Sequence, residues 1–117
     1  MGTRGEILER LELGLKRYNH GVRVDDDTRT WGTPKDSWME MAKGELLDAI
    51  IYTVADYIRN VRSEGERAPL SFRKNDELDD NKLIMSIVDD WEYVESPQHK
   101  MVLWNLFKML NSDIFRD

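Results

Sequence analysis

Residues 37–61 read SWMEMAKGELLDAIIYTVADYIRNV and form the longest stretch of the chain that is compatible with a helix. The stretch has no proline, and its single glycine, Gly44, lies near the start. The helix is expected to open either with Thr33-Pro34 or with Ser37. Ser37 and Glu40 have the spacing of a capping box, so we expect Glu40 to act in capping. At about 100° per residue, much of the circumference is apolar, with Leu46, Leu47, Ile50, Ile51, Val54, Tyr57, Ile58 and Val61. A helix of this kind usually lies between neighbours, which predicts that residues 37–61 form the central helix.

Three further helices are predicted around it. Residues 3–19 are amphipathic, with Thr3 and Glu6 spaced as a capping box and Asn19 as a stop. A third helix begins at residue 79 or 80, and Ser96-Pro97 begins a fourth. The expected buried face of the fourth helix consists of Val102, Leu103, Leu106, Phe107, Leu110 and Ile114. We therefore expect one all-α, four-helix bundle-like domain over residues 1–117, with a helical core at 1–62 and a C-terminal helical pair at 75–117.

The longest predicted loop, residues 20–35, connects the first two helices. Loops longer than about 12 residues are uncommon in compact domains unless they are functional or disordered. Val22, Val24 and Trp31 argue against disorder, and we expect them to anchor the loop. Residues 25–27 are all Asp, and they either cap the backbone in a solvated turn or position a metal or a phosphate.

The amino-acid composition of the chain argues against several kinds of binding site and partner. The chain has 117 residues, a formal net charge of −6 and no cysteine, which excludes disulfides and thiolate metal sites. An acidic chain without clustered Lys and Arg is not expected to bind nucleic acid, whereas a small phosphorylated ligand held through a metal is compatible with acidity. No stretch approaches the ~18 apolar residues of a membrane span, so we expect a soluble, cytoplasmic protein with no membrane partner.

The candidate chemistry is carboxylate chemistry on helices. The sequence has no Walker-type loop and no His-Glu-x-x-His motif, and it has only two histidines. A Ser-His-Asp arrangement stays open, although no nucleophile-elbow motif supports one. Glu45-x-x-Asp48 places two carboxylates one turn apart, in a polar stripe that continues through Tyr52, Asp56 and Arg59. This stripe is either a solvated face with an Asp56–Arg59 pair or a site for a hard cation such as Mg²⁺.

The string GELLDAIIYTVADYIR, with the Glu-rich helix before it, resembles the MazG-like all-α nucleoside triphosphate pyrophosphohydrolases, a family that includes phage proteins. The resemblance covers roughly residues 5–62. That family carries a Glu-x-x-Glu pair on one helix and a Glu-x-x-Asp pair on the next, and together they hold Mg²⁺ against a nucleoside triphosphate. Glu45-Leu46-Leu47-Asp48 matches the second pair, and both Glu6-x-x-Glu9 and Glu9-x-x-Glu12 fit the first.

The resemblance implies a reaction and a set of residues. Water would attack between the α and β phosphates, giving a nucleoside monophosphate and pyrophosphate. It implies Glu9, Glu12, Glu45 and Asp48 as the metal ligands, with Glu45 and Asp48 as the catalytic pair. Residues available to neutralise the polyphosphate are Lys16, Arg23, Arg29, Lys35 and Arg59, and Trp31 or Trp38 could stack on a base.

Two other functions stay open. One is a non-catalytic, phage-type interaction protein that binds and modulates a host protein, since Trp and Met are favoured at contact surfaces. The other is a binder that sequesters nucleotides without turnover. We expect a homodimer or homotetramer built on the first two helices, because the central helix is apolar on more sides than three neighbours need.

Overall fold

The computed structural model describes residues 2–74 and 76–116, and over these residues it is all-α, as predicted. The four α-helices are α1 (Thr3–Tyr18), α2 (Trp38–Arg62), α3 (Asn81–Asp89) and α4 (Pro97–Leu110). Short 3₁₀ turns lie between and after them: η1 (Thr28–Trp31), η2 (Gly65–Arg67), η3 (Leu70–Phe72), η4 (Trp91–Tyr93) and η5 (Asp113–Phe115). None of the described helices is both long and apolar enough to cross a membrane.

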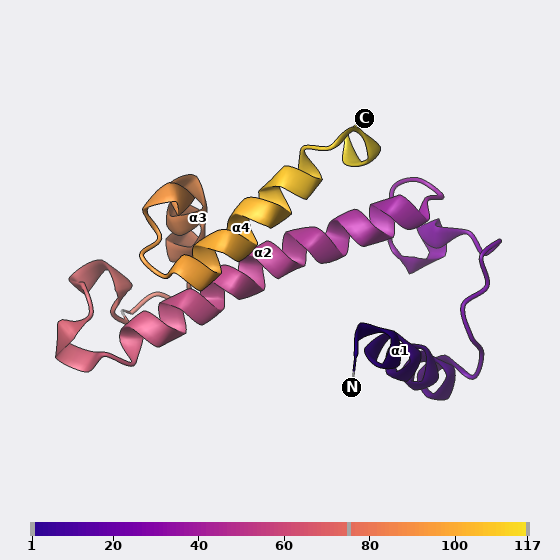
Figure 1. Cartoon of the computed structure of the whole chain (residues 1–117), viewed down its shortest axis with the longest axis horizontal. Coiled ribbons are helices and arrows are strands. Elements are labelled where there is room, and N and C mark those ends of the chain that lie inside the picture. The colour runs from indigo at the N-terminus through magenta and orange to yellow at the C-terminus, as the bar shows by residue number, and fades with distance from the viewer. Residues whose placement is uncertain (1, 75, 117) are drawn as a thin grey trace.

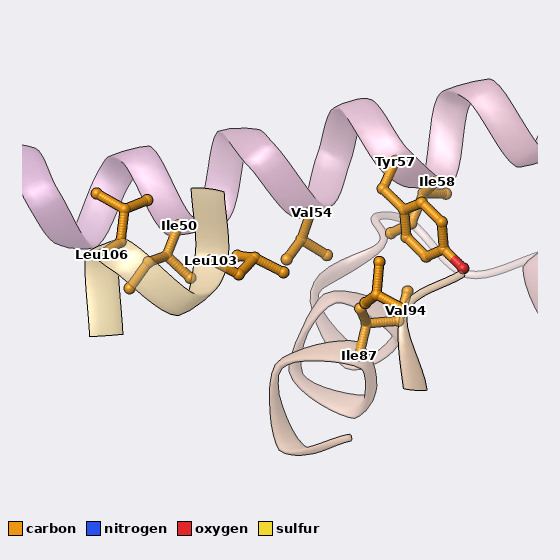
Figure 2. Close-up of a cluster of buried hydrophobic side chains, with 8 residues drawn as sticks. All are labelled: Ile50, Val54, Tyr57, Ile58, Ile87, Val94, Leu103 and Leu106. Atoms are coloured by element: carbon orange, nitrogen blue, oxygen red, sulfur yellow. The ribbon is translucent and has the colours of Figure 1, made fainter. Parts of the chain in front are cut away.

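The core lies where α2 packs against α3 and α4 (Figure 1). Val54 of α2 and Leu103 of α4 are fully buried and lie against each other in Figure 2. The rest of the core consists of Ile50, Tyr57, Ile58, Ile87, Val94 and Leu106. The core therefore joins α2, from the predicted 1–62 region, to both helices of the predicted 75–117 pair. Residues 75 and 117, which bound that pair, lie outside the described residues.

The helix ends follow from local side-chain chemistry in most cases. The Ser37 hydroxyl accepts a hydrogen bond from the Glu40 amide (3.2 Å), which confirms the predicted start of α2 at Ser37. Asn19 ends α1 in the left-handed conformation (φ 63°), also as predicted. The predicted cap at Thr3 is wrong, because Gly2 is the capping position and no side chain bonds the free amides there.

α1 contributes no buried side chain to the fold. Figure 1 shows it set apart from the other three helices, at the end of the loop that leads into α2. The radius of gyration, 17.7 Å, exceeds the value of about 13 Å expected for a compact chain of this length. The packed bundle thus consists of α2, α3 and α4, and the apolar stripe of α1 stays open to solvent.

Several side chains predicted to be buried are exposed for this reason. Leu47 and Ile51 of α2 are 46% and 43% exposed, because α3 and α4 cover the Ile50–Val54 side of the helix and nothing in the described chain covers the next side fully. Ile114 is exposed because α4 ends at Leu110, so the expected helical face does not extend that far.

Candidate functional site

One side of α2 near its N-terminus carries both aromatic and acidic side chains. Trp38, Met41, Glu45 and Asp48 follow one another at spacings of three, four and three residues, which puts them on one side of the helix. Glu45 and Asp48 are exposed, and Met41 is half-buried. The predicted Glu-x-x-Asp pair therefore lies one turn beyond an apolar, partly covered patch.

That patch is the floor of a hollow of about 250 Å³ between α1, the 20–35 loop and the start of α2. Its lining is mainly aliphatic and aromatic, and it includes Leu11, Leu15, Tyr18, Trp31, Trp38 and Met41. The rings of Tyr18 and Trp31 meet edge to face, with centroids 5.6 Å apart. The hollow presents aromatic faces and edges of the kind that bind a planar ring.

The loop that closes this hollow is held by Thr28, which the sequence analysis did not single out. Thr28 is fully buried, and its hydroxyl accepts a hydrogen bond from the Ser37 amide (2.6 Å) and donates to the carbonyl oxygen of Lys35 (3.1 Å). Its own amide donates to Asp36 (3.0 Å), and its hydroxyl also contacts that of Thr33 (2.8 Å). The loop is thus tied directly to the cap of α2, and only the Thr-rich composition of residues 28–33 hinted at it.

The predicted apolar anchors of the loop are wrong for Val22 and Val24, which are exposed. Val24 takes part through its backbone instead, since its carbonyl oxygen accepts a hydrogen bond from the Trp38 indole (2.9 Å). Trp31 is 42% exposed, so it covers the hollow from one side and is only partly buried. α1 meets the loop through Tyr18 and the sides of the hollow, and this contact leaves Val22 and Val24 uncovered.

Two of the three consecutive Asp residues of the loop, Asp26 and Asp27, form ion pairs with neighbouring arginines. Arg23 binds Asp26 (3.0 Å), and Arg29 binds Asp27 (2.6 Å). Hydrogen bonds from Arg29 lower the pKa of Asp27, and those from Asp27 raise the pKa of Arg29. Asp27 also accepts from the Arg29 amide and thereby caps η1, which matches the backbone-capping reading of these residues.

The predicted substrate-binding cations Lys16, Arg23 and Arg59 lie on three different elements: α1, the loop and α2. Lys16 is exposed in the last turn of α1. Arg23 lines the hollow. Arg59 is exposed on α2, about 16 Å farther along the helix axis than Asp48, so a single chain does not bring it to the pair.

Glu9 and Glu12 are exposed on α1, about 160° and 100° around the helix from the hollow-lining Leu11. Among residues 2–74 and 76–116, no three His, Asp or Glu side chains are grouped closely enough to hold a metal ion. One chain therefore presents Glu45 and Asp48 as a pair, and the four-carboxylate set stays a prediction that needs another arrangement of α1.

Comparison of the chain with protein-family models, curated proteins and solved structures finds no match.

Proposed function

We propose that the chain is a Mg²⁺-dependent nucleoside triphosphate pyrophosphohydrolase that releases a nucleoside monophosphate and pyrophosphate. The observation that carries the proposal is the aromatic hollow at Trp31 and Trp38, because its α2 lining residues, Trp38 and Met41, lie on the same side of the helix as Glu45 and Asp48. A base in the hollow would direct its phosphates along α2 toward the two carboxylates. Such a protein would act in the cytoplasm, where nucleoside triphosphates are made and used.

Glu45 and Asp48 fit Mg²⁺ by the chemistry of their donors. Mg²⁺ takes oxygen ligands and is commonly held by one or two carboxylates together with substrate phosphates and water. Both side chains are exposed and lie on the same side of α2, so both can reach one ion. Bound there, Mg²⁺ would neutralise charge on the triphosphate and polarise its phosphoryl oxygens. Arg23 and Lys16, from the loop and α1, would neutralise the remaining phosphate charge, and Trp31 or Trp38 would hold the base.

The proposal includes a homo-oligomer, a dimer or a tetramer, that covers α1 and the open side of α2. The apolar stripe of α1 stays about half exposed along its length, with Ile7, Leu8, Leu11, Leu15 and Tyr18. Leu47 and Ile51 of α2 expose a second apolar strip beside Glu45 and Asp48. Packing α1 of one copy against this strip of another would bury both surfaces and place Glu12 at the edge of the contact. Glu9, about 160° around α1 from Leu11, would face away from that contact.

The test is pyrophosphate release from a panel of ribo- and deoxyribonucleoside triphosphates with and without Mg²⁺. Glu45→Gln and Asp48→Asn should each lower turnover by about 100-fold or more, since each removes a charged oxygen ligand. Glu92→Gln is the matched control, because Glu92 is an exposed carboxylate on η4, outside this face of α2. Equal turnover in Glu45→Gln and Glu92→Gln would refute the carboxylate site.

A second candidate function is protein binding without catalysis. The outer face of α4 exposes Met101, Trp104 and Met109, residue types that are enriched at contact surfaces. On this reading the chain binds and modulates a host protein, as small phage proteins do, and neither Mg²⁺ nor nucleotides change its stability. Nucleotide binding by calorimetry without pyrophosphate release would instead identify a sequestering binder.

A further inference from the structure

Three side chains, one from α2 and two from the start of α4, form a continuous line of hydrogen bonds away from the hollow at Trp31 and Trp38. Ser96 Oγ lies 2.5 Å from His99 Nδ1, and His99 Nε2 lies 2.6 Å from Asp56 Oδ2. His99 is largely enclosed, with its side chain 16% exposed, and its ring packs against that of Tyr57 with the two ring centroids 5.7 Å apart. Tyr57 in turn accepts a hydrogen bond from the Glu95 amide through its hydroxyl (3.3 Å), so the segment before Ser96 is held to α2.

Which atom carries the proton in each of these two hydrogen bonds follows from which groups have a hydrogen to donate. An ionised Asp56 has no hydrogen to give, so in the neutral imidazole the proton is on Nε2 and is donated to the carboxylate. Nδ1 then carries a lone pair, and the Ser96 hydroxyl must donate to it. A serine whose hydroxyl donates to a histidine that a carboxylate orients is the arrangement of an activated nucleophile.

The position of Ser96 in α4 adds to this geometry. Ser96 is the capping residue of a 14-residue helix, and Pro97 follows at the first helical position. A nucleophilic serine followed three residues later by a basic side chain is also the spacing of the Ser-x-x-Lys acyl-transfer enzymes. Amides in the first turn of a helix point toward the capping residue and stabilise negative charge there.

Ser96 and His99 also line a hollow of about 690 Å³ between the C-terminal half of α2, the η2–η3 segment, α3 and η4. Tyr57, Phe72 and Tyr93 give it aromatic walls. Its charged lining residues are Glu64, Asp90 and Glu95 against the single guanidinium of Arg67. This excess of carboxylates opposes a phosphorylated ligand and favours an uncharged or cationic one.

We propose that Ser96 is the nucleophile, and His99 the general base, of a second site that hydrolyses uncharged or cationic carboxylic esters, with Asp56 as the residue that positions His99. The site is separate from the proposed nucleotide site, because it uses neither Glu45 nor Asp48 and its lining repels phosphates.

The reaction balances within these residues and water. Ser96 Oγ attacks the ester carbonyl carbon while its proton passes to His99 Nδ1. The bond between that carbon and the alcohol oxygen breaks, and the alcohol leaves with the proton from His99. A water molecule then attacks the acyl carbon and gives a proton to His99. The bond to Ser96 Oγ breaks, the acid leaves, and Oγ recovers its proton.

The test labels the folded parent chain with an uncharged alkyl fluorophosphonate, which phosphonylates activated serines, and then measures the labelling of Ser96 and of Ser37 by mass spectrometry of proteolytic peptides. Ser37 is an internal control, because it caps α2 as Ser96 caps α4, is similarly half-buried, and has no histidine at its hydroxyl. We expect Ser96 to react at least 10-fold faster than Ser37. Reaction of both serines at the same rate would overturn the proposal and leave Ser96 as a helix cap only.

Three variants test the roles of His99 and Asp56. His99→Gln should reduce labelling of Ser96 to the rate of Ser37. Asp56→Asn should reduce it about 10-fold without changing the melting temperature, because Asp56 is 60% exposed and the Asn60 side-chain amide that also donates to it (3.4 Å) can donate to an asparagine oxygen as well. Asp56→Glu should recover part of the loss. An Asp56→Asn chain that labels as fast as the parent would remove Asp56 from the site, and a labelled His99→Gln chain would overturn the mechanism. Hydrolysis of a 4-nitrophenyl ester should follow the same order.

Discussion

Replacing Thr28 by Val tests whether one buried hydroxyl holds the loop over the proposed base site. Valine has nearly the same shape, so the change leaves the packing of the buried side chain intact and removes only the hydroxyl. The hydrogen bond most affected is the one from the Ser37 amide (2.6 Å), since that amide lies at the start of α2 and is partly buried.

The expected decrease in the free energy of unfolding follows from the loss of that acceptor. A buried donor left without a partner costs about 1–3 kcal/mol, and we take about 2 kcal/mol because the Ser37 amide is only partly enclosed. For a domain of this size that corresponds to a fall in melting temperature of about 8 °C if the loop unfolds with the core. If the loop opens locally, the same free energy appears as faster hydrogen exchange at the Ser37 amide.

The assay is thermal unfolding together with amide exchange, with Thr30→Val as the matched control. The Thr30 hydroxyl donates to the Asp27 carbonyl oxygen (2.8 Å) at an exposed position, so its loss should cost no more than about 0.5 kcal/mol. Identical melting temperatures and identical exchange of the Ser37 amide in the two variants would refute the role assigned to Thr28.

Three further predictions concern the core, acid stability and assembly. Leu103→Ala should lower the free energy of unfolding, measured by chemical denaturation, by about 3 kcal/mol, because the side chain is fully buried. Trp104→Ala, at a neighbouring residue that is 51% exposed, should lower it clearly less. Equal losses in the two variants would mean that α4 is packed differently. Hydrogen bonds from Arg62 lower the pKa of Asp80, so their stabilisation is present above about pH 4 and is lost as the pH falls through the lowered pKa. Asp80→Asn should therefore be less stable than the parent at neutral pH and equal to it in strong acid, and a difference that persists in acid would contradict the assignment. Leu11→Asp should reduce the sedimenting mass to one chain, and a parent that is already monomeric at micromolar concentration would contradict the proposed oligomer.

The parts of the fold that could be predicted from sequence depend on neighbours in the chain. Ser37 and Ser96 cap their helices through amides three residues away, and Asn19 ends α1 through its own backbone conformation. The long helix α2 follows in the same way from its periodicity and the absence of proline. These features need no knowledge of what packs where.

The parts that could not be predicted depend on tertiary contacts. Leu47 and Ile51 have the same apolar spacing as Ile50 and Val54, and only the placement of α3 and α4 decides which of them are buried. Thr28 resembles the other threonines of its loop in sequence, yet it alone turns inward.

The candidate sites also differ in whether local sequence or tertiary packing brings their residues together. The pairing of Glu45 with Asp48 is local to one helix and was visible in the sequence. His99 and Asp56 are 43 residues apart, and only the packing of α4 on α2 brings them to 2.6 Å. The hollow at Trp31 and Trp38 likewise needs three separate segments to meet.

The two sides of α2 have different roles, one in the core and one in the proposed function. One side packs against α3 and α4, so the core forms without α1. The other side holds Glu45 and Asp48 beside the exposed Leu47 and Ile51. Whatever covers those two apolar side chains also approaches the carboxylates, and it brings its own charges near them. If the cover is the apolar stripe of α1 from a second copy, Glu12 at the edge of that contact would repel Glu45 and Asp48 unless a cation lay between them. Oligomer formation and Mg²⁺ binding would then strengthen each other, because each removes a cost that opposes the other.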